Sequence, residues 1–312
     1  MGKDKIAWVN RLRGLAILAV VLGHINTPLT PFIFSWHMPF FFFLSGFLLS
    51  RRNLTESIKL DFRRLIIPYF VFGFLAILAE YLKRNFWPGF DYIHSSFSFK
   101  EEFISLFLWM DAGKIHTYGF ILWFLPALFW SKNIVILLYK IFRSNWIILV
   151  IGLLLWFLVI NQKEIWWFGL DKAMISIVWI ALGKLVRVNI HKILRSWLVI
   201  LLGLFLFLEP IPVLNMAYKI ALDPIVGLIY PMAMILLLIY FFRKVQIGLL
   251  SSLGMNSMLI FALHPYTNNL AYIIIGKYWF IEFIVSLICL FVVLWFRNVI
   301  KKTRYANLVN WI

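Results

Sequence analysis

Charged residues are scarce in this chain. Only 14% of its 312 residues are Asp, Glu, Lys or Arg, whereas 63% are hydrophobic, and the mean hydropathy is +0.91. A soluble domain of this composition would expose a very large apolar surface to water, so soluble folds are excluded. Lipid must therefore be the main solvent of the folded chain.

Cysteine is nearly absent, and so are the patterns of metal and nucleotide sites. Cys289 is the one cysteine, which excludes an intramolecular disulfide. The sequence has no Cys/His cluster with metal-site spacing, no glycine-rich phosphate loop after a strand and no Gly-x-Ser-x-Gly motif. We therefore expect neither a metal nor a tightly bound cofactor.

What the chain does contain is a series of apolar runs from end to end. Each is near the roughly 20 residues that a helix needs to cross a bilayer. Helices are expected because unpaired backbone is too costly in hydrocarbon, and barrel strands would alternate in polarity. We predict an all-α, polytopic membrane bundle in one transmembrane domain, residues 1–312, with about ten spans at residues 12–28, 32–50, 65–82, 118–139, 146–161, 173–188, 196–209, 224–242, 257–275 and 280–297.

Lysine and arginine are distributed unevenly between the two sides of this predicted bundle. The segments on the side of the N-terminus carry 21 of them and those on the opposite side carry 8, with Lys132 inside a span. The positive-inside rule therefore places both termini in the cytoplasm. The net charge of +17 follows from this bias and suits anionic lipid headgroups, so we expect no nucleic-acid partner.

The first predicted helix carries two ionisable residues on one face. Arg13 and His24 are eleven residues apart, which is three helical turns plus about 20°. Asn10 lies one turn before Arg13 on the same stripe. Because ionisable groups inside a membrane are costly, they usually face the bundle interior and have a function. The alternatives are that Arg13 only anchors the helix at the cytoplasmic side and that His24 only bonds a neighbouring helix.

The second predicted helix contains a histidine beside a proline. Pro39 cannot donate to the carbonyl of Ser35, which predicts a loosened helix next to His37. His24 and His37 are predicted at similar depths on adjacent helices, and together they would form an acid/base centre. The alternative for His37 is an aromatic-belt position beside Trp36.

A third histidine lies in the predicted ninth helix. Ser257 and His264 are seven residues apart and so share one face of it, Asn256 is positioned to cap its start, and Pro265 loosens it beside His264. The sequence leaves open whether Ser257 and His264 line a substrate pocket or have a structural role.

Several segments together resemble acyltransferase family 3, which comprises membrane O-acyltransferases. They occur in the family's order over most of the chain: the run from Asn10 to His24 with its Arg-x10-His spacing, His37 to Phe47, Arg63 to Pro68, Leu122 to Phe129, and Leu253 to His264. Asn10 departs from the pattern because an acidic residue is usual there.

The resemblance implies an acyl-CoA co-substrate, usually acetyl-CoA, that enters from the cytoplasm. It implies an acceptor hydroxyl on a polysaccharide, glycolipid or sugar, and decoration of the cell envelope from a bacterial cytoplasmic membrane. By the same resemblance, His24 is the catalytic histidine and Arg13 its partner on the donor path. A neutral imidazole can take the proton of the acceptor hydroxyl or can itself be acylated first. The sequence leaves both routes open, and it leaves the oligomeric state open.

The resemblance also makes two arginines of the loop between the second and third predicted helices donor-binding residues. Arg63 and Arg64 correspond to the family's basic loop, and Arg51 and Arg52 precede them on the same predicted side. Arginine suits the phosphates of coenzyme A because its planar fork donates two hydrogen bonds. The alternative is that these arginines only mark a cytoplasmic loop.

Two other functions are compatible with buried His and Arg residues. A transporter or flippase of a lipid-linked or anionic substrate would use them as a translocation path, and a structural subunit of a polysaccharide assembly would not need His24. Transporters often have matched interrupted helices in two halves. Here the polar groups concentrate in the first three predicted helices, which favours an enzyme.

The charge asymmetry gives a testable topology. Reporter fusions after Arg51, Arg195 and Arg304 should be cytoplasmic, and a fusion at Asp91, in the long connector 83–117, should be external, because positive loops stay inside. Paired phosphatase and fluorescent-protein reporters measure this. A cytoplasmic Asp91 would overturn the predicted helix count.

Overall fold

Helices make up nearly all of the structure. A computed structural model describes residues 3–49, 53–86, 97–108, 115–193 and 196–302. Within these residues, extended structure is confined to β1 (Leu214–Asn215) and β2 (Ile220–Ala221), which pair in antiparallel fashion. A helix satisfies its own backbone polar groups within one segment, as a chain in lipid requires. The predicted all-α class is confirmed.

Each predicted apolar run contains a helix, but not every one of these helices is long enough to cross a bilayer. In the described part of the chain, six helices are long and apolar enough to cross a bilayer: Leu54–Phe86, Tyr118–Phe142, Trp167–Ile190, Val226–Lys244, Ser257–Ile275 and Trp279–Ile300. The helices at Asn145–Val159 and Trp197–Leu208 are apolar but shorter. The chain is thus a multi-pass membrane protein, while the count of ten and the cytoplasmic termini stay predictions.

The contacts within the chain divide it into two units. Unit 1 comprises Met1–His37 and Leu236–Ile312, and unit 2 comprises Met38–Ile235. The division falls inside α3 (His37–Phe47) and α11 (Val226–Lys244). The two units are described separately, and the single domain over residues 1–312 stays a prediction.

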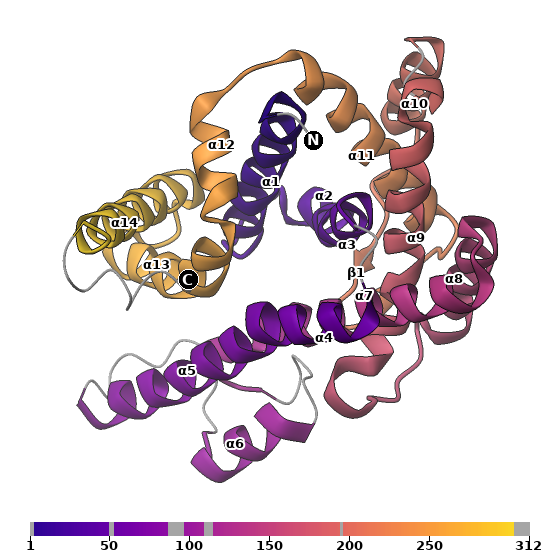
Figure 1. Cartoon of the computed structure of the whole chain (residues 1–312). Helices are drawn as coiled ribbons and strands as arrows, with labels where there is room; N and C mark the ends of the chain where they lie inside the picture. The colour runs from indigo at the N-terminus through magenta and orange to yellow at the C-terminus, as the bar shows by residue number, and fades with distance from the viewer. Residues whose placement is uncertain (1–2, 50–52, 87–96, 109–114, 194–195, 303–312) are drawn as a thin grey trace. The chain divides into compact units, whose positions relative to one another are not determined.

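Unit 1 is built around a close pair of helices. In it α1 packs along α12, and α13 lies beside α14 (Figure 1). Two glycines allow α1 to pack closely against α12. A Cβ on Gly14 would lie 1.9 Å from the carbonyl oxygen of Leu250, and a Cβ on Gly254 would lie 1.9 Å from the carbonyl oxygen of Asn10. Small residues of this kind let helix backbones approach closely in membrane proteins. The helices that lie wholly in unit 1 are α1 (Lys3–Gly23), α2 (Thr30–Phe34), α12 (Gly248–Met255), α13 (Ser257–Ile275) and α14 (Trp279–Ile300).

Two local predictions about helix ends are wrong. Because α3 begins at His37, Pro39 lies in its first turn, where a missing N–H breaks no helical hydrogen bond and loosens nothing. Asn256 precedes α13, but its side chain does not cap that helix. It donates instead to the carbonyl of Ser252 at 2.7 Å and accepts a hydrogen bond from Arg297 of α14.

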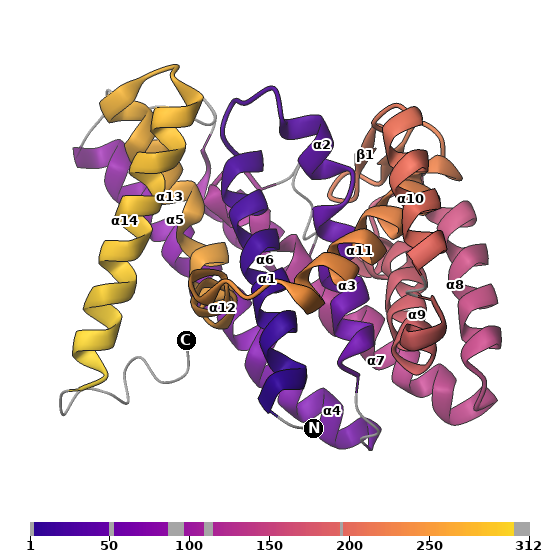
Figure 2. The same ribbon diagram turned by 90° about the horizontal axis from the view of Figure 1, so that it is seen from above.

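Unit 2 holds most of the remaining helices. In it α7 and α8 both pack against α9 (Figure 2). Lys132, which the sequence leaves inside a span, lies on α7 and pairs with Asp61 at the end of α4. The elements are α4 (Leu54–Asp61), the π-helix η1 (Phe62–Ile66), α5 (Ile67–Phe86), α6 (Phe99–Leu108), the 3-10 helix η2 (Tyr118–Trp123), α7 (Phe124–Phe142), α8 (Asn145–Val159), the 3-10 turn η3 (Trp167–Gly169), α9 (Leu170–Ile193) and α10 (Ser196–Leu208).

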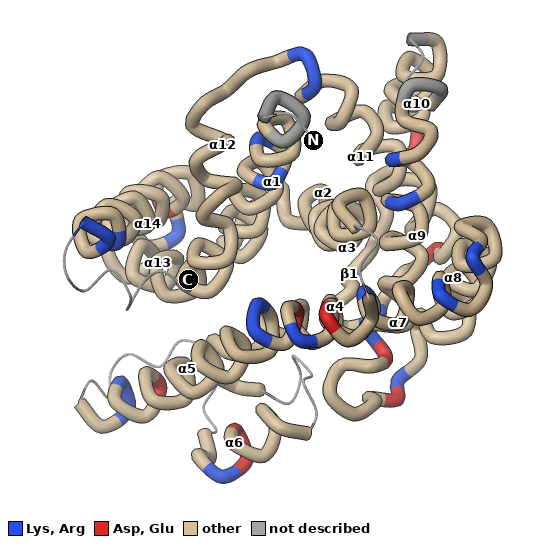
Figure 3. The backbone as a smooth tube through the Cα atoms, in the orientation of Figure 1, with Lys and Arg blue, Asp and Glu red and all other residues tan. Residues whose placement is uncertain are grey.

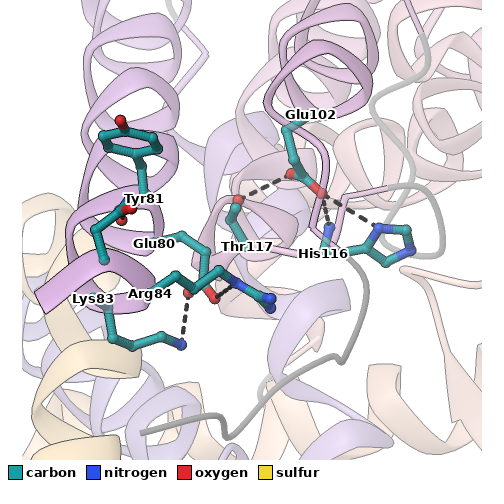
Figure 4. A network of polar contacts seen from close by, with 8 residues as sticks. Glu80, Tyr81, Lys83, Arg84, Glu102, His116 and Thr117 are labelled. Carbon is teal, nitrogen blue, oxygen red and sulfur yellow. Dashed lines mark hydrogen bonds and ion pairs between the residues drawn. The ribbon is translucent and has the colours of Figure 1, made fainter. Parts of the chain in front are cut away.

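In the described residues 97–108 and 115–117 of the long connector, polar contacts gather around a buried carboxylate (Figure 4). Glu102 of α6 is 1% exposed and accepts hydrogen bonds from the backbone N–H of His116 at 2.6 Å and the hydroxyl of Thr117 at 3.3 Å. Burial raises the pKa of Glu102, and these hydrogen bonds oppose the rise. Figure 4 also shows the ion pair of Glu80 with Arg84 on α5. The predicted loop therefore contains a helix and a fixed polar network.

The glycine contact between α1 and α12 can be tested by adding one methyl group. Gly254→Ala should lower the free energy of unfolding by about 1–3 kcal/mol, because its Cβ would overlap a backbone carbonyl that cannot move independently. Gly248→Ala, on the same helix but with nothing within 4 Å of its Cβ, should leave stability unchanged. Thermal unfolding of both proteins in detergent measures the difference. Equal stability of the two variants would contradict the close approach.

Candidate active site

His24 directly follows the last residue of α1. Its backbone N–H donates to the carbonyl of Val20 at 3.3 Å, and its ring Nδ1 lies 2.9 Å from the same oxygen. A carbonyl can only accept, so Nδ1 carries the hydrogen and Nε2 carries the lone pair. This tautomer leaves Nε2 as the basic and nucleophilic nitrogen.

His37 is held in the same way at the start of α3. Its side chain is 2% exposed, and its Nδ1 donates to the carbonyl of Ile33 at 2.7 Å. Its lone pair is therefore also on Nε2.

His264 lies on α13 and is completely buried. Pro265 has no N–H for the carbonyl of Phe261, four residues before it, and His264 uses that carbonyl instead, with Nδ1 at 2.8 Å. Nε2 of His264 is buried and has no hydrogen-bond partner among the described residues. The proline that the sequence marked as a weak point thus fixes the tautomer of the histidine beside it.

Unit 1 brings the three imidazoles into one cluster. The ring centroids of His24 and His264 are 4.8 Å apart, with 62° between the ring planes. Phe34 contacts His24 at 5.7 Å and His37 at 5.1 Å. His37 was the predicted partner of His24, and it lies close enough to His24 to interact with it electrostatically. His264, which was not predicted to join this pair, packs edge-on against His24, and Phe34 contacts both His24 and His37. In the described ranges no group of three His, Cys, Asp or Glu has the arrangement of a metal site.

A chain of polar side chains ties the end of α1 to α13 and α14. Asn268 of α13 donates to the carbonyl of Val21 at 2.9 Å, and Ser286 of α14 donates to Asn268 Oδ1 at 2.6 Å. Thr267 bonds Ser286 at 2.9 Å. The Val21 carbonyl is among the last four of α1, which have no partner within their helix. The sequence analysis missed these residues, although polar side chains in a predicted span were the signal that could have revealed them.

The other predicted residues of the first and ninth spans take varied positions in unit 1. Arg13 is half-buried on α1, and Asn10 presents its backbone carbonyl to Gly254. Ser257 begins α13 and is half-buried, two turns before His264. Arg11, which the sequence analysis used only as a charge, is 7% exposed and donates to the carbonyl of Phe242 at 2.9 Å.

The predicted donor-binding arginines lie in unit 2. Arg63 and Arg64 are both exposed on η1, in a stretch where Figure 3 shows acidic and basic segments following one another. Here Ile67 donates to the carbonyl of Phe62, five residues back, which is the π-helical pattern. Such turns occur frequently at functional sites. Arg51 and Arg52 lie outside the described residues.

A buried acid precedes the two arginines, and the sequence analysis did not identify it. Asp61 is 3% exposed and accepts from Nζ of Lys132 at 2.5 Å, from Ser57 at 3.2 Å and from Asn133 at 3.5 Å. These contacts join the end of α4 to α7. The lysine inside a predicted span was the available signal, because a buried charge needs a counter-charge.

Comparison with known proteins identifies the family. A family model described as an acyltransferase domain matches residues 6–297, which include the histidine cluster and η1. No curated protein and no solved structure matches the chain. With nearly the whole chain matched, the protein belongs to acyltransferase family 3, the membrane acyltransferases that its sequence resembles.

Proposed function

We propose that the protein transfers an acetyl group from cytoplasmic acetyl-CoA to a hydroxyl of an envelope polysaccharide, glycolipid or sugar, in a bacterial cytoplasmic membrane, with His24 at the reaction centre. The observation that carries this proposal is the fixed tautomer of His24, whose Nδ1–H is bonded to Val20. Membership in the family favours this enzyme over a transporter or flippase.

The orientation of His24 suits acyl transfer. Its Nε2 can take the proton of an acceptor hydroxyl while the hydroxyl oxygen attacks the thioester carbonyl. The carbon–sulfur bond then breaks, and the coenzyme A thiolate leaves and recovers a proton. Alternatively, Nε2 attacks the thioester first and carries the acyl group. In both routes, the Val20 carbonyl holds the ring still and stabilises the positive charge that develops on it.

The remaining residues have supporting roles in the proposal. The exposed guanidinium groups of Arg63 and Arg64 would bind the phosphates of coenzyme A, because arginine forms paired hydrogen bonds to phosphate oxygens. Arg51 and Arg52 have the same proposed role. The half-buried Arg13 belongs to the donor path.

The acceptor side is proposed to be lined by residues of unit 1. Asn10 and Ser257 are half-buried, and His37 and His264 are buried within the histidine cluster. We propose that the acceptor hydroxyl is presented to His24 among these side chains.

Replacing His24 tests its assignment to catalysis. His24→Gln and His24→Ala should both insert into the membrane and lose acetyl transfer by at least about 100-fold, because neither side chain has a basic nitrogen. Turnover of acetyl-CoA by purified protein, with a glycolipid fraction from the same membranes, measures the loss. His116→Gln, which alters a histidine of unit 2, is the control and should keep its activity. Near-normal turnover of His24→Gln would remove His24 from the mechanism.

The donor-site assignment is tested separately. Replacement of both Arg63 and Arg64 by Ala should raise the KM for acetyl-CoA at least tenfold with a smaller change in kcat, because the lost contacts bind phosphates away from the reacting carbonyl. Lys140→Ala removes another exposed cation of unit 2 and should leave KM unchanged. If both proteins have the KM of the wild type, Arg63 and Arg64 only orient the chain in the membrane.

A further inference from the structure

We propose that His264 is a second catalytic group, the general base that takes the proton of the acceptor hydroxyl while His24 carries the acyl group. This inference rests on the proposed acyl transfer, and it selects one of the two routes that the sequence leaves open. It assigns a task to a buried histidine that a single-step reaction would not need.

The first support is the direct contact between the two rings. With 4.8 Å between their centroids, a group bonded to Nε2 of His24 lies in the immediate surroundings of His264. His37, the other imidazole of the cluster, packs against Phe34 and lies close enough to both rings to interact with them electrostatically. The edge-on ring contact between His24 and His264 places His264 to act on a molecule that attacks an acyl group on His24.

The second support is that both imidazoles have the same tautomer. Nδ1 of His24 donates to Val20 and Nδ1 of His264 donates to Phe261, so each ring has its lone pair on Nε2. One such nitrogen can attack a thioester and the other can accept a proton, without any change of tautomer between the steps.

The third support is the buried Nε2 of His264, which lacks a hydrogen-bond partner among the described residues. A buried acceptor without a donor costs free energy, and a bound group that donates a hydrogen bond to it would remove that cost. An acceptor hydroxyl would supply the missing donor. In a single-step reaction with His24 as the base, His264 Nε2 would have no chemical task to offset the free energy that its burial costs.

The contact between the His24 and His264 rings is held by the chain of polar side chains that joins α1 to α13 and α14. Asn268 bonds the Val21 carbonyl and lies one helical turn after His264 on α13, and Ser286 holds Asn268. The end of α1, which positions His24, and the segment of α13 that carries His264 are thus fastened to each other. The geometry needed for two successive steps is fixed in advance, as catalysis requires.

The bonds, charges and proton of the proposed reaction balance over two steps. First, His24 Nε2 forms a bond to the thioester carbonyl carbon, the carbon–sulfur bond breaks, and coenzyme A leaves as the thiolate, so that His24 becomes a positively charged acyl-imidazolium. Second, the acceptor oxygen attacks the acyl carbon as His264 Nε2 takes its proton. The carbon–nitrogen bond breaks and its electron pair returns to His24. The proton on His264 then passes through water to neutralise the thiolate.

Isotope exchange separates these steps. Purified protein is incubated with acetyl-CoA and tritiated coenzyme A, and the appearance of label in acetyl-CoA reports the first step without any acceptor. Transfer of labelled acetyl to a glycolipid fraction from the same membranes reports both steps. His264→Gln and His264→Asn are compared with His24→Gln and His37→Gln, and His116→Gln is the control.

We expect the wild type and the control to catalyse exchange and transfer. Both His264 variants should retain exchange within about threefold and lose transfer by at least about 100-fold, which is the lower end of the usual contribution of a general base. His24→Gln should lose both reactions. Retained exchange also shows that the His264 variants are folded.

Several outcomes would overturn the proposal. Absence of exchange in a wild type that still transfers acetyl would exclude the acyl-His24 route while leaving the proposed function intact. Normal transfer by the His264 variants, or loss of exchange in both of them, would remove His264 as the second-step base. Loss of transfer alone in His37→Gln but not in His264→Gln would assign the base to His37. A wild type that transfers no acetyl at all would instead refute the proposed function.

Discussion

The need to bond every buried imidazole N–H is the constraint on which the rest of the site depends. In a lipid-embedded bundle the nearest acceptors for such groups are backbone carbonyls. At His24, His37 and His264 the Nδ1–H takes a carbonyl of its own segment, three or four residues earlier. A structural requirement thereby sets the chemistry, because the nitrogen that remains basic is Nε2 in all three rings.

Helix ends supply the carbonyls that make this arrangement possible. Val21 lies in the last turn of α1, where its carbonyl has no helical partner, and it accepts from Asn268. The Val20 carbonyl accepts from both the backbone N–H and Nδ1 of His24. On α13, Pro265 leaves the Phe261 carbonyl without its usual donor. Buried charges in unit 2 follow the same logic: Asp61 faces Lys132, and Asp171 at the start of α9 lies within 3.0 Å of Lys219 and 3.2 Å of Lys172. Removing one partner of such a pair is far more costly than removing an exposed charge.

The limits of the sequence-based predictions follow from what helical periodicity can show. The spacing of Arg13 and His24 indicates a shared face because both lie on one helix. The neighbours of His24 depend on which helices pack together. The short loop to the second helix indicated His37, but nothing in the local sequence indicates the ring contact with His264, 240 residues away along the chain. Asn268 and Ser286 were overlooked because a single polar residue in an apolar run has no partner visible in sequence. Asp61 was overlooked because it lies among other charged residues, and its pairing with Lys132 depends on the packing of α4 against α7.

Composition and pattern by themselves determined that the chain is all-α and lies in a membrane, because an apolar chain must satisfy its backbone within helices. They also determined its resemblance to acyltransferase family 3, through short motifs whose order is a property of the chain alone. Only the tertiary structure decided where α1 ends and α3 begins, and with them the hydrogen bonds that fix His24 and His37. It also decided that His264 packs against His24, since that contact arises from the packing of α13 beside α1, and local sequence does not encode which distant helices meet.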